Sequence, residues 1–291
     1  MLTNTASDRV ARVRRLARAS ARRQFGQLLV EGPQACREAA LEGLVVDLYA
    51  TADAAAHPEV AAAALDRGGY FHEASPEYVR AISPDSQGMA AVARDPWAGW
   101  GLAEALAAPH GPAADGQTTS GAAPAIPPGP AADGRAVALV AVFEQIQDPG
   151  NAGAAIRSAD AAGADLVVFT DQSVDPAAPK VVRASAGSYF HLPVVRAGTA
   201  GQLIPALKAA GLRVLAADRG GSVPLSRAGL DQPTAWLFGN EARGLSAATL
   251  AASDLTVRIE IYGRAESLNL AMAATLCLYA SAAARRAGRA S

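Results

Sequence analysis

Three glycine-containing loops in the second half of the chain carry polar side chains of the kinds that bind ligands or stabilise charge. They span residues 148–153, 237–246 and 259–269, and each begins within or just after an apolar segment. Glycines at a strand-to-helix turn let a ligand approach the backbone, and the N-terminus of the following helix favours anions such as phosphate. These loops are therefore the first candidates for a binding site.

The first loop leads into a helical pattern that carries Asn151 and Arg157. Arg157 lies about two turns into this helix among alanines, where a large cation needs a partner. Two interpretations are open: a contact with an anionic ligand, or a structural salt bridge with Asp160 or Asp165. The glycine spacing is not G-x-G-x-x-G, so a dinucleotide site is not supported, and the chain has no Walker loop.

The second and third loops have similar chemistry. In the second, Gly239 ends an apolar strand and is followed by Asn240 and Glu241. Glycine and asparagine are common turn residues for conformational reasons alone, so this loop is weak evidence by itself. In the third, Ser267 and Asn269 enter an apolar, alanine-rich helix, where helix capping and ligand contact both explain them.

The elements around these loops indicate a mostly parallel sheet. Apolar strands separated by helical patterns are typical of a sheet that helices cover on both faces. Ligands of such sheets bind at the carboxyl ends of the strands, which is where the three loops fall. Strands are predicted near residues 137–143, 166–169, 194–195, 214–217, 236–238 and 257–261.

The first half of the chain predicts a smaller α/β domain with a basic start. Seven arginines and one acidic residue lie between residues 8 and 23, which are predicted to form one helix. Such a basic segment suits a polyanion, although a solvated helix face is equally open. Further elements are predicted as a helix from Pro33, a strand at 45–50, a helix at 58–66, a strand at 70–71, a helix at 76–82 and a strand at 89–93.

Composition divides the chain into two domains. Its 291 residues, 51% of them hydrophobic, are enough for two cores. Residues 107–135 are rich in Ala, Pro, Gly, Ser, Thr and Asp and have almost no large apolar residue, which is typical of a flexible linker. We therefore predict an N-terminal domain at 1–107, a linker at 108–134 and a second domain at 135–291.

Cysteine content and hydropathy limit the class of protein. The two cysteines, Cys36 and Cys277, exclude a disulfide framework and a cysteine-rich metal site, and no metal is expected. The first residues lack the apolar run of a signal peptide, and Asn269, Thr275 and Ser281 interrupt the longest apolar stretch. We expect a cytoplasmic protein without a membrane span.

Taken together and in this order, the three loops resemble the three signature motifs of the SpoU (TrmH-like) branch of the SPOUT RNA methyltransferases. The resemblance covers residues 137–282 and includes the stretches 179–187 and 191–193. The N-terminal part resembles the family's RNA-binding substrate domain, most closely at residues 30–33.

This resemblance implies a fold, a reaction and a set of site residues. The fold would be an α/β SPOUT domain with a largely parallel sheet and a deep trefoil knot, in a homodimer, beside a small N-terminal α/β RNA-binding domain. The cofactor would be S-adenosyl-L-methionine. Its implied contacts are Phe238, Gly239, Asn240, Ile259, Ile261, Ser267 and Leu268. The implied catalytic residues are Arg157, Asn151, Glu241 and Asn269.

The implied reaction is 2′-O-methylation of a ribose in structured RNA, with 23S ribosomal RNA favoured over tRNA because a separate N-terminal domain is more typical of the ribosomal-RNA enzymes. A catalytically silent RNA-binding or assembly factor is a further alternative. Arginine stays protonated in proteins, so we interpret Arg157 as a cationic clamp on the developing alkoxide rather than a base. Implied RNA contacts are Arg14, Arg15, Arg22, Arg23, Lys180 and Arg183.

Overall fold

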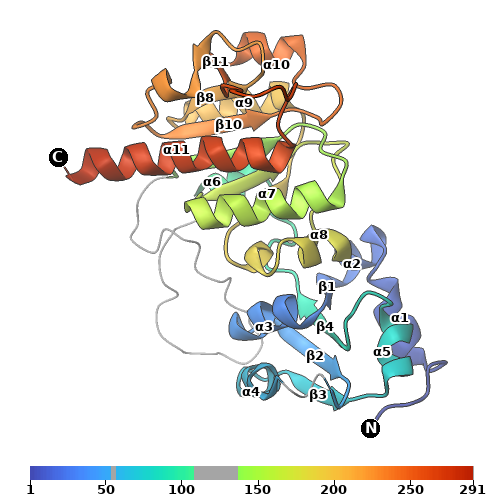
Figure 1. The fold of residues 1–291 in the computed structure, drawn as a ribbon. Coiled ribbons are helices and arrows are strands. Elements are labelled where there is room, and N and C mark those ends of the chain that lie inside the picture. Colours follow the sequence, from blue (N-terminus) through green and yellow to red (C-terminus); the bar gives the residue numbers. More distant parts are fainter. Residues whose placement is uncertain (54–56, 108–136, 291) are drawn as a thin grey trace. The chain divides into compact units, whose positions relative to one another are not determined.

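The computed structural model describes residues 1–53, 57–107 and 137–290, and these form two compact units (Figure 1). The first unit contains residues 1–99 together with 175–190, and the second contains the rest. The predicted linker at 108–134 lies outside the described residues. Residues 102–107 belong to the second unit, whereas the domain boundary was predicted at 107.

The first unit contains a four-stranded mixed sheet in the order β1-β4-β2-β3. Strand β4 is antiparallel to both of its neighbours, and β2 and β3 are parallel. Apolar side chains such as Leu28, Leu48 and Met89 are fully buried on it, as their type predicts. The strands are β1 (Gln27–Glu31), β2 (Val45–Ala50), β3 (Tyr70–Glu73) and β4 (Met89–Arg94).

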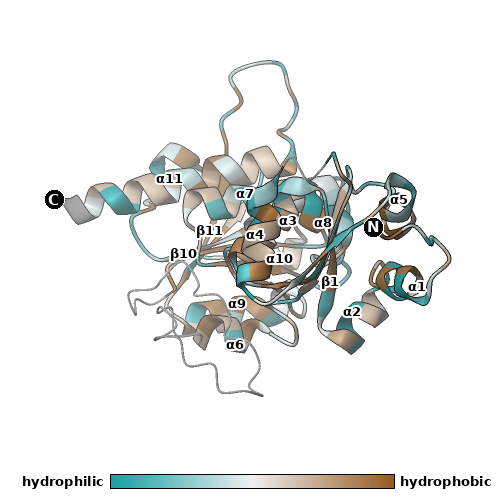
Figure 2. Ribbon diagram, turned by 90° about the horizontal axis from the view of Figure 1, so that it is seen from below, coloured by the Kyte–Doolittle hydropathy of each residue, from teal (hydrophilic) through white to brown (hydrophobic). Residues whose placement is uncertain are grey.

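The basic N-terminal segment forms two helices, so the prediction of one helix over 8–23 is wrong. The first helix buries Val10 and Val13, while its arginines leave the opposite side hydrophilic (Figure 2). It ends at Arg15, and the Arg22 guanidinium donates hydrogen bonds to the carbonyls of the next two residues, Leu16 (2.8 Å) and Ala17 (2.9 Å). The helices of this unit are α1 (Asp8–Arg15), α2 (Ala19–Phe25), α3 (Pro33–Leu41), α4 (Pro58–Asp66) and α5 (Pro76–Ile82).

A segment from the middle of the chain completes the first unit. Residues 175–190 contain α8 (Pro179–Ala184) and a 3₁₀ turn, η2 (Ser188–Phe190), and α8 packs on the edge strand β1. Asp175 forms an ion pair with the buried Arg22 at 2.5 Å, and the Trp97 indole N–H donates to the Tyr189 carbonyl at 2.8 Å. The unit is thus assembled from two parts of the chain that are far apart in sequence.

The second unit is built on a seven-stranded sheet in the order β7-β6-β5-β10-β8-β11-β9. Every neighbouring pair is parallel, which confirms the predicted sheet type. The predicted strand at 257–261 is shorter than expected, because its neighbours β8 and β9 end before they can pair with residues 259–261. The strands are β5 (Leu139–Phe143), β6 (Leu166–Phe169), β7 (Val194–Arg196), β8 (Arg213–Ala217), β9 (Val223–Pro224), β10 (Thr234–Phe238) and β11 (Leu255–Arg258).

Helices cover both faces of this sheet, as predicted (Figure 1). The last helix packs on α7 and on β5 and β10, where the buried Trp236 indole donates to Ser281 Oγ at 2.9 Å. No helix in the described ranges is long and apolar enough to cross a bilayer. The helices are α6 (Leu102–Ala107), α7 (Pro149–Ala162), α9 (Ala200–Ala209), α10 (Ala247–Ala252) and α11 (Leu270–Ala290), with a 3₁₀ turn η3 (Leu225–Arg227).

Three aromatic rings support the loops at the carboxyl edge of the sheet. Phe143, Phe169 and Phe238 are the last residues of β5, β6 and β10, and all are buried. The Phe143 ring stacks on Phe169 at 5.6 Å and on Phe238 at 5.2 Å between centroids. Such offset contacts add to the burial energy of large rings, so the strand ends form a firm base for the loops above them.

Candidate functional site

The three loops meet in one hydrogen-bonded chain of side chains. The Asn269 amide, at the start of α11, donates to Asn151 Oδ1 at 2.9 Å, and the Asn151 amide, on α7, donates to Glu241 Oε1 at 3.3 Å. Asn269 Oδ1 also accepts the N–H of Ala271 at 2.9 Å, so it caps the helix and joins the network at once. The polar residues of the three loops therefore come together, as the motifs predict.

Asn240 fixes the shape of the second loop. Its amide group donates to the Gln145 carbonyl at 2.8 Å, and its Oδ1 accepts the N–H groups of Ala242 (3.0 Å) and Arg243 (3.2 Å). Gln145 has a left-handed backbone with φ 55°, which directs the chain from β5 toward this contact. Asn240 thus links the first loop to the second.

Gly239 is needed for a close backbone approach. A Cβ atom at this position would lie 2.2 Å from the Gly244 carbonyl carbon and 2.3 Å from the Leu245 nitrogen. Asn240 and Gly244 exchange backbone hydrogen bonds of 3.1 and 2.8 Å across the same turn. Only glycine fits here without a shift of the backbone.

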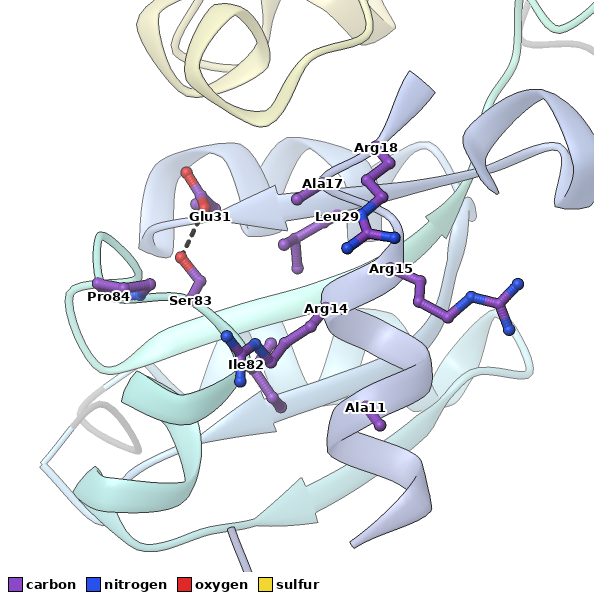
Figure 3. A pocket seen from close by; sticks show the side chains of 10 residues that line it. All are labelled: Ala11, Arg14, Arg15, Ala17, Arg18, Leu29, Glu31, Ile82, Ser83 and Pro84. Carbon is purple, nitrogen blue, oxygen red and sulfur yellow. Dashed lines mark hydrogen bonds between the residues drawn. The ribbon is translucent and has the colours of Figure 1, made fainter. Parts of the chain in front are cut away.

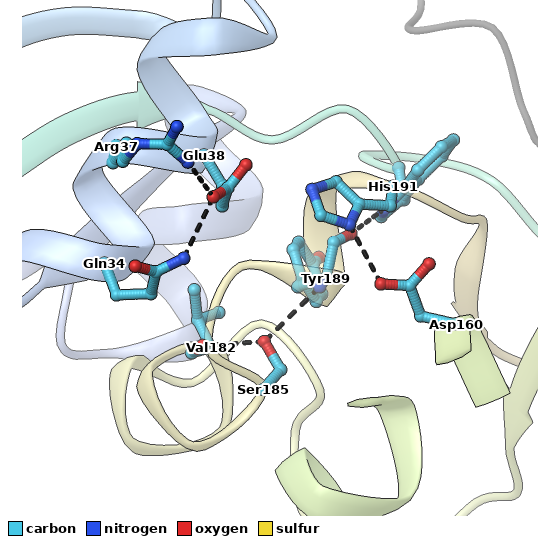
Figure 4. Close-up of polar contacts among 9 residues, drawn as sticks. Gln34, Arg37, Glu38, Asp160, Val182, Ser185, Tyr189 and His191 are labelled. Carbon is cyan, nitrogen blue, oxygen red and sulfur yellow. Dashed lines mark hydrogen bonds and ion pairs between the residues drawn. The ribbon is translucent and has the colours of Figure 1, made fainter. Parts of the chain in front are cut away.

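Arg157 is exposed on α7, and among the described residues its guanidinium has no ion-pair or hydrogen-bond partner. The structural salt bridges that the sequence left open are not formed. Asp160 instead contacts His191 Nδ1 at 2.9 Å (Figure 4), and Asp165 accepts the backbone N–H groups of Ala138 and Leu139. The interpretation of Arg157 as a contact for an anionic ligand is therefore favoured.

A pocket of about 130 Å³ lies beside the third loop. Ile259, Ile261, Ser267 and Leu268, four of the seven predicted cofactor contacts, line it. It is smaller than the roughly 300–1,000 Å³ of typical small-molecule sites. The loop at 260–267, which supplies Ile261, Glu266 and Ser267 to its wall, is exposed, so the pocket can enlarge if this loop moves. Its lining is apolar except for Asp218, Arg219, Glu266 and Ser267.

The Phe238 side chain is not part of the pocket wall. This ring is 1% exposed and stacks on Phe143 and on Trp236, and the Phe238 carbonyl already accepts the Glu144 N–H at 2.8 Å. Phe238 therefore supports the site from below rather than lining the pocket. Gly239 and Asn240 shape the adjacent turn and are not among the residues that line it.

In the first unit, basic residues border a pocket of about 480 Å³ (Figure 3). Arg14, Arg15 and Arg18 line it, with the hydrogen-bonded pair Glu31 and Ser83 at 2.5 Å in the same wall. The three guanidinium groups have no acidic partner among the described residues, and Arg15 lies 5.7 Å from the Phe25 ring centroid. This surface can accept an anion.

Not every predicted RNA contact is available. Arg22 is 4% exposed and holds the Leu16 and Ala17 carbonyls and the Asp175 carboxylate, so its prediction as an RNA contact is wrong. Arg183 is half-buried and paired with Glu31 and with Asp85. The other predicted contacts, Arg14, Arg15, Arg23 and Lys180, are exposed.

Comparison with known proteins identifies this arrangement. Residues 138–279 match the model of the SpoU rRNA Methylase family, and this stretch contains all three loops and their hydrogen-bonded side chains. Residues 138–279 therefore belong to the SpoU family.

Two relatives of this part of the chain are 23S rRNA methyltransferases. One is the 23S rRNA (guanosine(2553)-2′-O)-methyltransferase RlmP of Bacillus subtilis, 40% identical over 48% of this chain and 56% of its own length. The other is the 23S rRNA (uridine(2479)-2′-O)-methyltransferase of Streptomyces viridochromogenes, 40% identical over 51% of this chain and 53% of its own length. The chain thus matches only about half the length of these relatives.

A solved SpoU structure matches almost the whole fold. It is the methyltransferase AviRb from Streptomyces viridochromogenes in complex with the cofactor AdoMet, with a TM-score of 0.74 and 28% sequence identity. The match covers 97% of this chain and 100% of that one. Both units of the present fold therefore have counterparts in a SpoU protein.

The motifs did not reveal three charged residues of the pocket. Asp218 and Arg219 follow β8, and Glu266 precedes the predicted Ser267. Strand β8 lies between β10 and β11 in the sheet, although it precedes both in sequence. The sheet order, which the sequence does not show, brings Asp218 and Arg219 to the site.

Proposed function

We propose that this protein transfers a methyl group from S-adenosylmethionine to a ribose 2′-hydroxyl of RNA, with ribosomal RNA as the substrate. The observation that carries the proposal is the hydrogen-bonded network of Asn269, Asn151 and Glu241, which joins the three loops of the SpoU motifs. The 23S rRNA substrates of the two named relatives support the choice of RNA. The intact network also favours an active enzyme over a silent RNA-binding factor.

The pocket beside the third loop suits this cofactor. Ile259, Ile261 and Leu268 offer an apolar surface to the flat adenine, and the acidic residues of the pocket suit a cationic donor. S-adenosylmethionine, when bound, supplies an electrophilic methyl group. Because the pocket is small and its loop is exposed, we expect binding to move residues 260–267.

Arg157 serves the nucleophile. The 2′-hydroxyl becomes reactive as it loses its proton, and a fixed cation stabilises the alkoxide that develops. Arginine stays protonated in proteins, so Arg157 acts as a clamp on the alkoxide and the neighbouring phosphate, and the proton leaves to phosphate or water. Asn151 lies about 9 Å from it along α7, where its two partners hold it in place.

The first unit binds the RNA away from the reacting ribose. Arg14 and Arg15 face a pocket wide enough for part of a nucleotide, and Arg23 and Lys180 add exposed positive charge. Contacts of this kind with phosphates position RNA without reading its sequence. The reaction is placed in the cytoplasm, because ribosomal RNA is found there.

A second copy of the chain completes the proposed enzyme. Met272, Leu276 and Tyr279 are 62%, 46% and 48% exposed on α11, at spacings that place them on one side of the helix. An exposed apolar stripe of this kind is typical of an interaction surface. We also propose that this domain contains the trefoil knot of SPOUT domains. In support, the chain leaves β11 near one edge of the sheet and crosses back, so that α11 packs on α7 and β5.

The proposal is tested by Arg157→Ala, with Arg227→Ala as a matched change at another exposed arginine. Both purified variants are titrated with S-adenosylmethionine and assayed for transfer of its methyl group to unmodified ribosomal RNA. We expect Arg157→Ala to lose methyl transfer while its cofactor affinity stays within a few-fold. Normal transfer by this variant would refute the assigned role, and a wild-type protein that does not bind S-adenosylmethionine would refute the function.

A further inference from the structure

The pocket beside the third loop is lined by three charged residues from two different parts of the chain. Asp218 and Arg219 follow the end of β8, and Glu266 lies in the loop that precedes α11. None of them belongs to the cofactor contacts that the family motifs imply. The family motifs therefore do not predict the charge of this pocket.

The charges of the pocket do not cancel. Arg219 Nη1 lies 2.6 Å from Glu266 Oε1, so this pair is neutral as a whole. Asp218 has no cationic partner among the described residues. Its Oδ1 accepts the backbone N–H of Gly220 at 2.8 Å, which holds the carboxylate in one orientation at the edge of the pocket. The lining residues together carry one negative charge, which belongs to Asp218.

We propose that Asp218 makes this pocket select the methyl donor, which carries a sulfonium, over the product, which does not. This inference rests on the proposed function. S-adenosylmethionine carries a sulfonium, an ammonium and a carboxylate, and has a net charge of plus one. When the methyl carbon bonds to the ribose oxygen, the carbon–sulfur bond breaks, its electron pair stays on sulfur, and the hydroxyl proton leaves. The resulting S-adenosylhomocysteine is a neutral thioether.

A fixed negative charge distinguishes these two ligands. It attracts the sulfonium of the donor, and after transfer this part of the attraction is lost, which favours release of the product. Two unit charges about 4 Å apart in water interact strongly enough to change an equilibrium by about fivefold, and more where solvent is excluded. Asp218 is only partly exposed, so an effect of about this size is expected if its carboxylate lies about 4 Å from the sulfonium.

Two substitutions change the net charge of the pocket in opposite directions. Asp218→Asn removes the net charge and keeps an oxygen to accept the Gly220 N–H, so the loop conformation is retained. Arg219→Gln leaves Glu266 without its cation, and the pocket then carries two negative charges. The first variant should reduce the preference for the donor, and the second should increase it.

The experiment is calorimetric titration of the full chain with S-adenosylmethionine and, separately, with S-adenosylhomocysteine at physiological ionic strength. Asp218→Asn should weaken donor binding by about fivefold or more and change product binding less than about twofold. Arg219→Gln should raise the ratio of donor to product affinity. Asp231→Asn, an exposed acidic residue outside the pocket, controls for the change in total charge and should leave the ratio unchanged.

Two results would overturn the inference. Equal weakening of both ligands by Asp218→Asn would mean that the carboxylate contacts a group which donor and product share, such as the ribose. An unchanged donor affinity in this variant would mean that Asp218 does not act on the ligand. A wild-type protein that binds neither ligand would instead refute the proposed function, so the two failures are distinguishable.

Discussion

The close approach at Gly239 gives a sharp prediction for a small substitution. In Gly239→Ala, the added methyl carbon would lie 2.2, 2.3 and 2.6 Å from the Gly244 carbonyl carbon, the Leu245 nitrogen and the Gly244 oxygen. All three atoms are backbone, so no side chain can rotate away to make room. The turn must open or the strand end must shift.

The free energy that this shift requires sets the size of the expected loss in stability or in cofactor affinity. Forcing an extra methyl group into a closely packed place destabilises proteins by about 1–3 kcal/mol. If the turn opens locally instead, the same free energy appears as weaker cofactor binding, by about 5- to 150-fold. Asn240 and Glu241 lie in this turn, so its opening also displaces the Asn151 contact.

Denaturant unfolding measures the loss of stability, and calorimetric titration with S-adenosylmethionine measures the loss of cofactor affinity. Gly201→Ala is the matched control, because its new methyl group would have only Thr199 Oγ1 within 4 Å, at 3.9 Å, in the first turn of α9. That change should be neutral or stabilise the protein by up to about 1 kcal/mol. If Gly239→Ala matches the wild type in affinity and, within about 0.5 kcal/mol, in stability, the described turn is wrong.

Two further predictions concern the rest of the molecule. Burial raises the pKa of Asp95 above its ordinary 3.8, despite hydrogen bonds from Trp97 N and Tyr189 Oη, so the native state binds this proton more tightly than the unfolded state. The free energy of unfolding of the wild type, relative to that of Asp95→Asn, should therefore rise as the pH falls from 7 toward 4. Denaturant titrations at several pH values measure this difference. If it does not change with pH, burial does not raise this pKa. Leu276→Glu should convert a dimer to a monomer by light scattering, while Leu65→Glu, at an exposed leucine of the first unit, should not; a dimer that survives Leu276→Glu does not use this face of α11.

Several elements were predictable because apolar runs define them. The strand at 166–169 and the helices at 58–66 and 76–82 have the predicted bounds. In a parallel sheet the loops after the strands share one edge, which is why three separated motifs could be expected to meet. The contacts among Asn151, Glu241 and Asn269 agree with that expectation.

Other features depend on contacts between distant residues, which local sequence patterns do not encode. Arg22 looks like its exposed neighbours in sequence, and only its contacts with the carbonyls at the end of α1 and with Asp175 explain its burial. A motif position also does not tell whether the side chain or the backbone faces a ligand, and the burial of the Phe238 ring shows this. Asp218 lies outside the motifs and reaches the pocket only through the position of β8 in the sheet.

In the proposed reaction, the three hydrogen-bonded loops direct a methyl group to a ribose oxygen. The most direct measurement is mass spectrometry of nucleosides from unmodified ribosomal RNA after incubation with the protein and isotopically labelled S-adenosylmethionine. We predict one labelled nucleoside whose added methyl group is on the ribose, and in the undigested RNA the phosphodiester 3′ of that residue resists alkaline hydrolysis. A labelled base, or RNA without label although the protein binds the cofactor, would contradict the account.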